Sequence, residues 1–427
     1  MTTWTSINPR LAGANHHVSQ SGGVMFWEKR LASWISRMRS QPGLPVRVQL
    51  WNGRHFDLST RAPEVTIRVL RPSALAYLLN PSLANLGRAY VEGKLEVEGH
   101  LRAIIDVANT LAHRAFHAKP NSTNRRLWPL SHTRHEDAAA IAYHYDVSNA
   151  FYAAFLDPGM VYSCAYFDTD DQDLATAQLK KIDHVLTKIR VRSGDRLLDI
   201  GCGWGSLVIR AAEKFGAQCT GITLSKNQYA LATERVRAAG LSDKINIRLE
   251  DYRDVSGRYD RITSVGMFEH VGLKNLSLYF STIRKLLDEN GLVMNHGITT
   301  TDVLEGHARY GAGDFINNYV FPQGELPHIG TVLKAMQEGG LETLDVENLR
   351  RHYARTCSLW AENFERNADR IRSLVDERRY RIWRVYLAGC SHAFQHDWIS
   401  LYQVVCGRSG RDASGLEWSR RYMYPSA

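Results

Sequence analysis

The stretch RLLDIGCGWGS, residues 196–206, constrains the fold of this chain more than any other. Its apolar residues Leu197, Leu198 and Ile200 are typical of the end of a buried parallel strand, and three glycines follow at alternate positions. From residue 207 onward the apolar residues recur at helical spacing. A strand that ends in a glycine turn and opens a helix lets backbone N–H groups approach a ligand closely, in front of the positive end of the helix. We therefore expect an α/β sheet with a ligand site at this turn.

The spacing of the glycines distinguishes between two kinds of ligand. The order Asp-x-Gly-x-Gly-x-Gly resembles the S-adenosylmethionine loop of class I methyltransferases more than a dinucleotide loop. A dinucleotide loop has the spacing Gly-x-Gly-x-x-Gly and an acidic residue about 20 positions later that binds a ribose. Here the next expected strand, residues 218–223, is followed by Leu224 and Ser225, without a carboxylate. A single glycine-rich loop is also compatible with a purely structural turn, so the rest of the chain must decide.

The composition sets the class of protein. A chain of 427 residues exceeds one ordinary core, so two or three domains are expected, and 44% hydrophobic with 23% charged residues indicates a globular protein. No apolar run approaches the ~18 residues of a membrane span, and residues 1–10 lack the core of a signal peptide. Six widely spaced cysteines without a Cys-x-x-Cys pair indicate reduced thiols and argue against a metal site or a disulfide frame. These features predict a cytoplasmic protein.

The charge of the chain points to an anionic partner. A net charge of +9 suits either acidic lipid headgroups or nucleic acid, and charge alone does not choose between them. The chain has no Asn-Pro-Pro-Tyr motif and no stripe of interleaved aromatic and basic residues, so nucleic acid ranks last.

Changes in composition divide the chain into four segments. Residues 1–40 are expected to form an arm and an amphipathic helix, and residues 41–118 a small α+β domain. Residues 119–136, with two prolines and mixed polar residues, are the expected linker. Residues 137–427 form a large domain around the glycine turn.

Two local patterns specify the first 118 residues further. Trp27 and Trp34, with basic residues beside them, fit a helix over residues 26–38 that either anchors in a membrane interface or docks on its own protein. Asn52-Gly53 lies between alternating apolar runs, which is a strong hairpin signal.

In the large domain, strands and helices alternate, which predicts a doubly wound parallel sheet. Besides the strand before the glycine turn, strands are expected near residues 218–223, 245–249, 259–265 and 291–296, and helices over 174–189 and 374–398.

Seven short motifs occur in one order along the chain. They are YSCAY (162–166), GCGWG (201–205), GITLS (221–225), DYRD (251–254), SVGMFEHVG (264–272), NYVFP (318–322) and QVV (403–405). Together they resemble the cyclopropane-fatty-acyl-phospholipid synthases, a family that includes mycolic acid cyclopropane synthases, over roughly residues 45–410. The resemblance implies a class I methyltransferase fold, with a Rossmann-like doubly wound sheet and a small, lipid-associated N-terminal α+β domain.

The resemblance also implies a reaction and a cofactor site. Members of this family transfer a methylene group, derived from the methyl group of S-adenosylmethionine, to a cis double bond of a phospholipid acyl chain. The positions that match the family's cofactor ligands are Tyr162, Ser163, Gly201, Cys202, Gly203, Thr223, Gln228, Tyr252 and Arg253. Trp204 is interpreted as a packing residue.

The chemistry of an alkene adds a second requirement. Methylation of the double bond produces a carbocation, which must lose a proton, and a carboxylate directly beside it would risk alkylation. The family uses a bound bicarbonate ion as the base, and its ligands match Cys164, Glu269, His296, the backbone of Ile298 and Tyr353. Cys390 matches a family cysteine often taken for a nucleophile; since this mechanism needs no thiolate, its role is interpreted as mainly structural.

Individual residues carry different weight in this interpretation. A carboxylate such as Glu269 just after a buried strand is costly unless it is solvated or paired, which favours a functional role. His270 is interpreted as structural. Gly297 stands where the family usually has a bulkier or hydroxylated residue, so the width of the pocket is expected to differ.

Three functions remain open at this point. The favoured one is an enzyme that cyclopropanates phospholipid acyl chains at the anionic inner face of the cell membrane, bound peripherally and possibly as a homodimer. A related methyltransferase that makes methyl-branched acyl chains, or methylates an amine, is the alternative. A lipid-binding protein without activity is the third, and the intact glycine loop argues against it.

Overall fold

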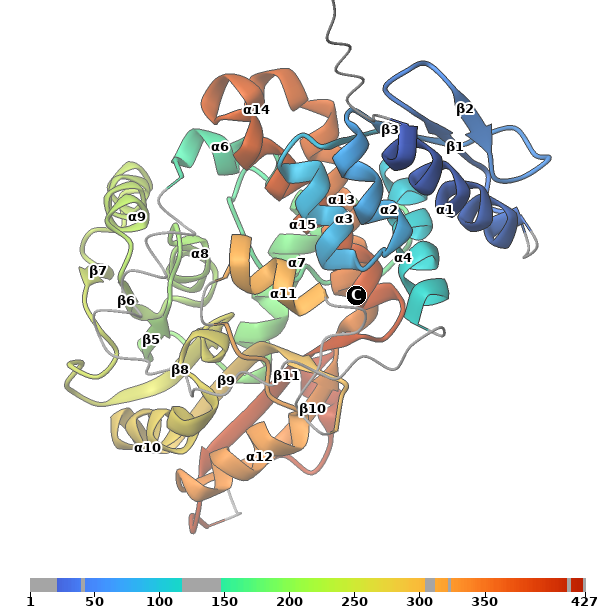
Figure 1. Cartoon of the computed structure of the whole chain (residues 1–427). Coiled ribbons are helices and arrows are strands. Elements are labelled where there is room, and N and C mark those ends of the chain that lie inside the picture. The colour runs from blue at the N-terminus through green and yellow to red at the C-terminus, as the bar shows by residue number, and fades with distance from the viewer. Residues whose placement is uncertain are drawn as a thin grey trace, which may run out of the picture.

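The computed structural model describes residues 21–39, 43–116, 147–303, 312–321, 324–412 and 416–424. The expected linker (119–136) and most of the expected N-terminal arm lie outside these ranges. Figure 1 shows an N-terminal domain beside a larger α/β domain.

The N-terminal domain is built on a four-stranded sheet of order β2-β1-β3-β4. Its elements are α1 (Ser21–Arg39), β1 (Val46–Gln49), β2 (His55–Asp57), β3 (Val65–Val69), η1 (Pro72–Ala74), α2 (Leu75–Leu79), α3 (Leu83–Val91), β4 (Leu95–Gly99) and α4 (Leu101–Phe116). The hairpin predicted at Asn52-Gly53 is confirmed, because β1 and β2 pair antiparallel across it. Strand β3 then returns parallel to β1.

Helix α1 docks on its own protein. Leu31, Trp34, Ile35 and Met38 recur at helical spacing, are buried, and share one core with the strands of the N-terminal sheet. The membrane-anchor interpretation of this helix is therefore wrong, since its apolar stripe is covered by the domain. The small domain begins within α1 and not after it.

We expect Trp34→Ala to lower the free energy of unfolding of the N-terminal domain by about 3–5 kcal/mol, the usual cost of truncating a buried tryptophan. Trp34 is 2% exposed, so the substitution leaves a cavity under α1. Chemical denaturation measures the change, and Ser33→Ala, at an exposed position on the same helix, is the matched control. An unchanged midpoint for Trp34→Ala would contradict the docking of α1.

The large domain contains a seven-stranded sheet of order β10-β11-β9-β8-β5-β6-β7. Its strands are β5 (Arg196–Ile200), β6 (Gln218–Thr223), β7 (Ile245–Leu249), β8 (Tyr259–Val265), β9 (Leu287–Thr300), β10 (Leu341–Asn348) and β11 (Ile399–Arg408). Its α-helices are α6 (Asn149–Ala153), α7 (Leu174–Lys188), α8 (Ser206–Phe215), α9 (Lys226–Ala238), α10 (Leu276–Leu286), α11 (Ala312–Tyr319), α12 (Ile329–Glu338), α13 (Arg350–Arg366), α14 (Ala368–Leu374) and α15 (Glu377–Gln395). The doubly wound α/β architecture predicted from the sequence is confirmed.

The sheet differs from the prediction at one edge. Strand β11 pairs antiparallel with both β9 and β10, so the sheet is mixed and not wholly parallel. Neither β10 nor β11 was predicted from the sequence. The strand predicted to end at His296 continues as β9 to Thr300, because β11 pairs with it along that length.

Helix α15 of the large domain contacts the N-terminal domain. Its Arg381 donates hydrogen bonds to the carbonyl of Tyr90 (2.9 Å) and to Glu96 (2.6 Å), and Arg384 donates to the hydroxyl of Tyr90 (2.9 Å). Residues of α3, α11 and α15 also form a small apolar cluster, in which Ile382 takes part. The N-terminal domain therefore packs against α11 and α15, as Figure 1 shows.

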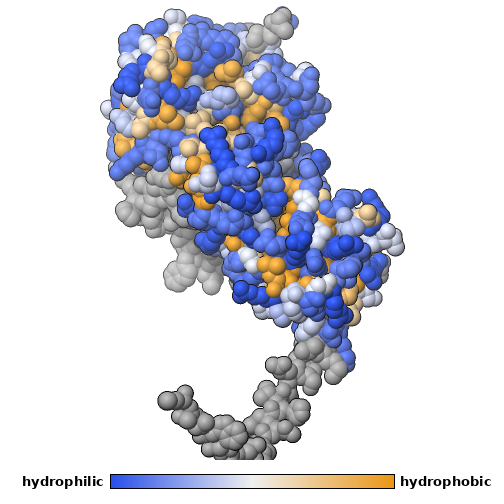
Figure 2. Space-filling view, turned by 90° about the horizontal axis from the view of Figure 1, so that it is seen from above, coloured by the Kyte–Doolittle hydropathy of each residue, from blue (hydrophilic) through white to orange (hydrophobic). Residues whose placement is uncertain are grey.

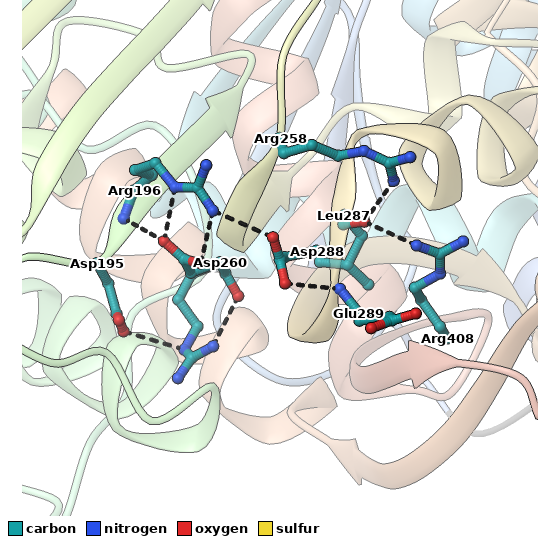
Figure 3. A network of polar contacts seen from close by, with 9 residues as sticks. Asp195, Arg196, Arg258, Asp260, Leu287, Asp288, Glu289 and Arg408 are labelled. Carbon is teal, nitrogen blue, oxygen red and sulfur yellow. Dashed lines mark hydrogen bonds and ion pairs between the residues drawn. The ribbon is translucent and has the colours of Figure 1, made fainter. Parts of the chain in front are cut away.

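A network of ion pairs stabilises the amino-terminal edge of the parallel strands. Arg196, at the start of β5, donates to Asp260 of β8 (2.9 and 3.0 Å) and to Asp288 of β9 (3.1 Å), as Figure 3 shows. Arg258 and Arg408 both donate to the carbonyl of Leu287. These polar contacts connect neighbouring strands at their amino-terminal ends, and the glycine turn lies at the opposite, carboxyl-terminal end of the strands.

In the view of Figure 2, hydrophilic residues cover most of the face, and hydrophobic ones lie in small patches between them. None of the described helices is both long and apolar enough to cross a bilayer. All six cysteines are free thiols.

Candidate functional site

A cavity of about 140 Å³ lies at the carboxyl ends of β5, β6, β7 and β8. In open α/β sheets this edge is where ligands bind. The glycine turn forms one wall of the cavity, and the loop that carries Tyr162 and Ser163 forms another.

The conformation of the glycine turn explains its sequence. Gly201 and Gly205 have φ angles of +81° and +85°, in the left-handed region that residues with a Cβ rarely adopt. On the neighbouring strand, a Cβ on Gly221 would lie 2.9 Å from the Cβ of Cys202, so a larger residue there would push the turn outward. The turn passes directly into α8, whose first backbone N–H groups need partners from outside the helix.

Eight of the nine predicted cofactor ligands line this cavity: Tyr162, Ser163, Gly201, Cys202, Gly203, Thr223, Gln228 and Tyr252. Arg253 does not. Its guanidinium folds back and donates to the carboxylate of Asp251 at 2.7 and 2.8 Å. Glu250, the first residue after β7, lines the cavity in its place.

Sequence reasoning also missed two charged residues of the cavity wall, Asp199 and Lys181. Asp199 belongs to the glycine motif itself and accepts a hydrogen bond from the hydroxyl of Thr263 at 2.7 Å. Burial raises the pKa of Asp199 to about 6. Lys181 lies on α7, where the sequence shows only an amphipathic helix and gives no signal of a site.

Two of the predicted cofactor ligands, Thr223 and Gln228, contact each other. The hydroxyl of Thr223 donates to Oε1 of Gln228 at 2.8 Å and accepts the backbone N–H of Ser225 at 3.2 Å, and both side chains are buried. The amide nitrogen of Gln228 is left to donate to a ligand hydroxyl.

The predicted anion ligands, among them Glu269 and His296, are not part of the cavity lining. Glu269 is buried, and its Oε1 accepts the backbone N–H of Ile298 at 2.7 Å. In this structure that N–H positions the carboxylate, which differs from the predicted contact with an anion. Oε2 of Glu269 has no partner among the described residues. Burial raises the pKa of Glu269 to about 7, against the lowering effect of the Ile298 hydrogen bond.

His296 is held in one tautomer. Nε2 of Gln403, on the paired strand, can only donate, so Nδ1 of His296 accepts at 3.3 Å and the ring proton lies on Nε2. That Nε2 is buried and has no partner among the described residues. Burial, with Lys181 and Lys188 nearby, keeps the pKa of His296 well below its usual value, so the ring is neutral at physiological pH.

The remaining predicted residues belong to an aromatic cluster. Tyr353 stacks on Phe394, with ring centroids 4.5 Å apart, and Cys164 and Cys390 pack in the same core. Burial raises the pKa of Cys390 to about 12, and that of Cys164 further, so neither forms a thiolate near neutral pH. This agrees with the structural interpretation of Cys390.

Trp204 and His270 also line the cavity, although both were interpreted as structural. The indole N–H of Trp204 donates to Asn149 at 2.8 Å, and its ring packs on Tyr152, which supports the packing role. The ring of His270 packs near Phe321.

The ring of Phe268 fills the space beside Gly297. A Cβ on Gly297 would lie 2.2 Å from Cε1 of Phe268, far inside a van der Waals contact. The small residue therefore does not by itself widen the pocket, because Phe268 occupies the volume.

We expect Gly297→Ala to lower turnover about 10²-fold, because Phe268 must move and Glu269 follows it in the chain; ångström displacements of reacting groups have costs of this order. The double variant Gly297→Ala/Phe268→Leu should recover most of the activity. Gly389→Ala, at a helical glycine with open space around it, is the control. Steady-state kinetics with a saturating methyl donor measures the turnover of all three variants. Wild-type turnover of Gly297→Ala would contradict the expected effect of Phe268 on the position of Glu269.

Comparisons with known proteins identify the family. The model of the mycolic acid cyclopropane synthetase family matches residues 132–404, and a domain of unknown function matches residues 33–120. A probable fatty acid methyltransferase of Pseudomonas putida is 48% identical over 384 residues, which cover 89% of this chain and 96% of that protein. The tuberculostearic acid methyltransferase UfaA1 of Mycobacterium tuberculosis is 37% identical over 87% of this chain and 90% of its own length.

Solved structures agree with this family. The cyclopropane synthase MmaA2 from Mycobacterium tuberculosis aligns with a TM-score of 0.61 at 32% identity and covers 65% of this chain and 99% of its own. The mycolic acid cyclopropane synthase CmaA1, in complex with SAH and CTAB, aligns with a TM-score of 0.60 at 34% identity over 63% of this chain and 97% of its own. The glycine turn, the order of the strands and these matches lead to one conclusion: the chain belongs to the mycolic acid cyclopropane synthetase family of S-adenosylmethionine-dependent methyltransferases.

Proposed function

We propose that this enzyme adds a methylene group to the cis double bond of an unsaturated phospholipid acyl chain and closes a cyclopropane ring. The observation that carries the proposal is that Oε2 of Glu269 and Nε2 of His296 are both buried and have no hydrogen-bond partner among the described residues. Buried polar atoms are seldom left without hydrogen bonds unless a ligand completes them.

The cavity fits S-adenosylmethionine. Thr223, Gln228 and Tyr252 would hold the adenosine part, and the glycine turn with Ser163 would hold the methionine part. The bound cofactor supplies an electrophilic methyl group. The protein's own contribution is to hold the alkene in line with that group and to exclude water, for which the buried aromatic cluster around Tyr162 is suited.

The next step is the loss of a proton from the new methyl group. Tyr162 lies with its ring 5.1 Å from that of Trp360, and such ring faces stabilise a nearby cation. The donor set also fits a bicarbonate ion: His296 offers an N–H, Glu269 a carboxyl oxygen and Tyr353 a hydroxyl, while Cys164 borders the site. Bicarbonate would supply a base that is not alkylated irreversibly by the cation.

A second candidate reaction is methyl branching without ring closure. It is favoured by the names of two relatives that match nearly the whole chain, a probable fatty acid methyltransferase and a tuberculostearic acid methyltransferase. In that case a hydride moves from the methylated carbon to the neighbouring cationic carbon, and loss of a proton from the new methyl group then leaves a methylene branch. The same cofactor site serves both reactions, so the product depends on whether the base removes the proton before or after the hydride shift.

The substrate class implies work at a membrane surface. The net charge is +9, and Arg370 and Arg378 are exposed and lie close in sequence to the exposed Leu374, while Arg372 pairs with Glu377 at 3.2 Å. Each basic residue near an anionic bilayer contributes about 1 kcal/mol of attraction. This supports peripheral binding to anionic membranes.

Mass spectrometry and NMR of lipids from cells that express the chain test the proposal. Cyclopropanation adds the mass of one methylene to monounsaturated lipids and removes their olefinic proton signals. Methylene branching adds the same mass but leaves a terminal alkene signal. An unchanged lipid profile, with purified enzyme that still binds the cofactor, would reject an acyl chain as the substrate.

A further inference from the structure

Lys181 is a buried cation on the wall of the cofactor cavity. It lies on α7, is 2% exposed, and its Nζ donates to Oγ of Ser163 at 2.8 Å. Among the described residues, no carboxylate forms an ion pair with this ammonium group, and its hydrogen bond goes to Ser163. Two of its three N–H donors therefore have no acceptor within the described part of the chain.

The nearest acidic residues are engaged elsewhere. The carboxylate of Asp157 accepts the backbone N–H groups of Gly159 (2.8 Å) and Val161 (3.0 Å). That of Asp199 accepts the hydroxyl of Thr263. Burial lowers the pKa of Lys181 to about 8, so the group is still largely protonated at neutral pH. A buried charge of this kind is costly unless an anion completes it.

The position of Lys181 indicates which anion this is. The ammonium of Lys181 contacts Ser163 and lies near Asp199, two residues before the glycine turn. Thr223 ends β6, and Gln228 lies in the first turn of α9. S-adenosylmethionine carries a single carboxylate, on its methionine part, and this lies at the end of the molecule opposite the adenine ring.

We propose that Lys181, assisted by the hydroxyl of Ser163, binds the α-carboxylate of the cofactor. The proposal rests on the proposed function, because it assumes that the cavity holds S-adenosylmethionine. Bicarbonate is a second anion with carboxylate-like oxygens that would satisfy Lys181, and the experiment below distinguishes it from the cofactor carboxylate.

The test compares two ligands that differ in the amino acid part, which carries the carboxylate. S-adenosylhomocysteine contains the amino acid part, and 5′-methylthioadenosine lacks it but retains the nucleoside and the sulfur. Calorimetry on the full chain measures both for the wild type, Lys181→Met and Ser163→Ala. Lys180→Met is the matched control, since Lys180 is the neighbouring residue on α7 but pairs with Asp168 at the surface.

Lys181→Met should weaken the binding of S-adenosylhomocysteine about 10–100-fold, as expected for the loss of a charged hydrogen bond. The binding of 5′-methylthioadenosine should stay within about twofold of wild type on the same scale. Ser163→Ala should show the same selectivity with a smaller loss, and Lys180→Met should match wild type for both ligands. Thermal unfolding of each variant confirms that it is folded.

Three results would overturn the assignment. Equal losses for both ligands would make Lys181 a structural residue. Unchanged binding of S-adenosylhomocysteine, with activity that becomes dependent on added bicarbonate, would assign the ammonium to bicarbonate. A wild-type chain that binds neither ligand would reject the proposed function itself, and the assignment with it.

Discussion

Glu269→Gln is expected to lower turnover by about 10²–10⁴-fold, the range for the loss of general-base catalysis, because Glu269 takes part in proton transfer by holding the proposed bicarbonate base. The carboxyl group of Glu269 is fixed by the backbone N–H of Ile298, and its second oxygen is buried without a partner among the described residues. Glutamine keeps the shape of the side chain and one carbonyl oxygen, but it cannot take the charge or the proton. Binding of S-adenosylhomocysteine should be unchanged, since Glu269 does not line the cofactor cavity.

The same substitution is expected to make the folded chain more stable above pH 7. Burial raises the pKa of Glu269 from 4.5 to about 7, so the native state binds the proton more tightly than the unfolded state. The native state therefore loses stability as the pH rises from about 4.5 to 7, and the full cost of the buried charge is present above pH 7. Glutamine removes that cost, and we expect a gain of about 1–3 kcal/mol at pH 8.

Denaturant unfolding at pH 5 and pH 8, combined with kinetics, tests both parts. The gain in stability should be large at pH 8 and small at pH 5. Glu289→Gln, at an exposed position just before the buried part of β9, should change neither activity nor pH dependence. A loss of both activity and stability at pH 8 would make Glu269 a structural residue and would remove the support for its role in proton transfer.

The fold could be predicted where a single element carries its own signal. β6, β7 and β8 have the predicted bounds. In β7, for example, the buried Ile245 and Ile247 alternate with exposed or partly exposed polar residues, which is the pattern of a strand covered on one face. β11 was not predicted. It contains Gln403, Cys406 and Gly407 and follows an arginine-rich helix, so only its pairing with β9 and β10 makes it a strand.

The site could be predicted where backbone conformation dictates the residue type. The glycine turn needs residues that tolerate positive φ, and this need is visible in the sequence. The directions of side chains are not visible there. Arg253 follows the predicted strand, but its side chain pairs with Asp251. The sequence around Lys181 has the pattern of a solvent-exposed helix face, whereas in the folded chain Lys181 lines the cavity.

A second large effect is expected at Lys188, which is fully buried on α7. Its Nζ contacts Oδ2 of Asp345 at 3.2 Å and also the carboxylate of Glu347, both on β10. Glu347 accepts a further hydrogen bond from His184 at 2.8 Å. Lys188→Met removes the cation that these carboxylates share, and Arg420 still pairs with Asp345 at 2.5 Å. We therefore expect a cost toward the lower end of the about 3–5 kcal/mol for removing one partner of a buried ion pair.

The pH dependence distinguishes this ion pair from simple packing. Burial alone would raise the pKa of Glu347, but His184 and Lys188 outweigh it and hold the pKa at about 2. A carboxylate with a lowered pKa stabilises the native state above its unfolded value of 4.5, and the stability is lost as the pH falls toward about 2. The deficit of Lys188→Met should therefore be largest near pH 7 and shrink toward pH 3, whereas a packing defect would cost the same at both.

Denaturant unfolding across this range measures the deficit, with Lys214→Met as the matched control. Lys214 pairs with Asp183 at 2.7 Å but is half exposed, so its loss should cost less than about 1 kcal/mol. Lys188 also lowers the pKa of His296, so the variant should shift the acid limb of the activity profile upward, because protonated His296 then forms at higher pH. A variant that is less stable but keeps the wild-type activity profile would show that the ion pair supports folding and does not affect His296. A variant with both the stability and the activity profile of the wild type would show that the charges of α7 and β10 do not support the site.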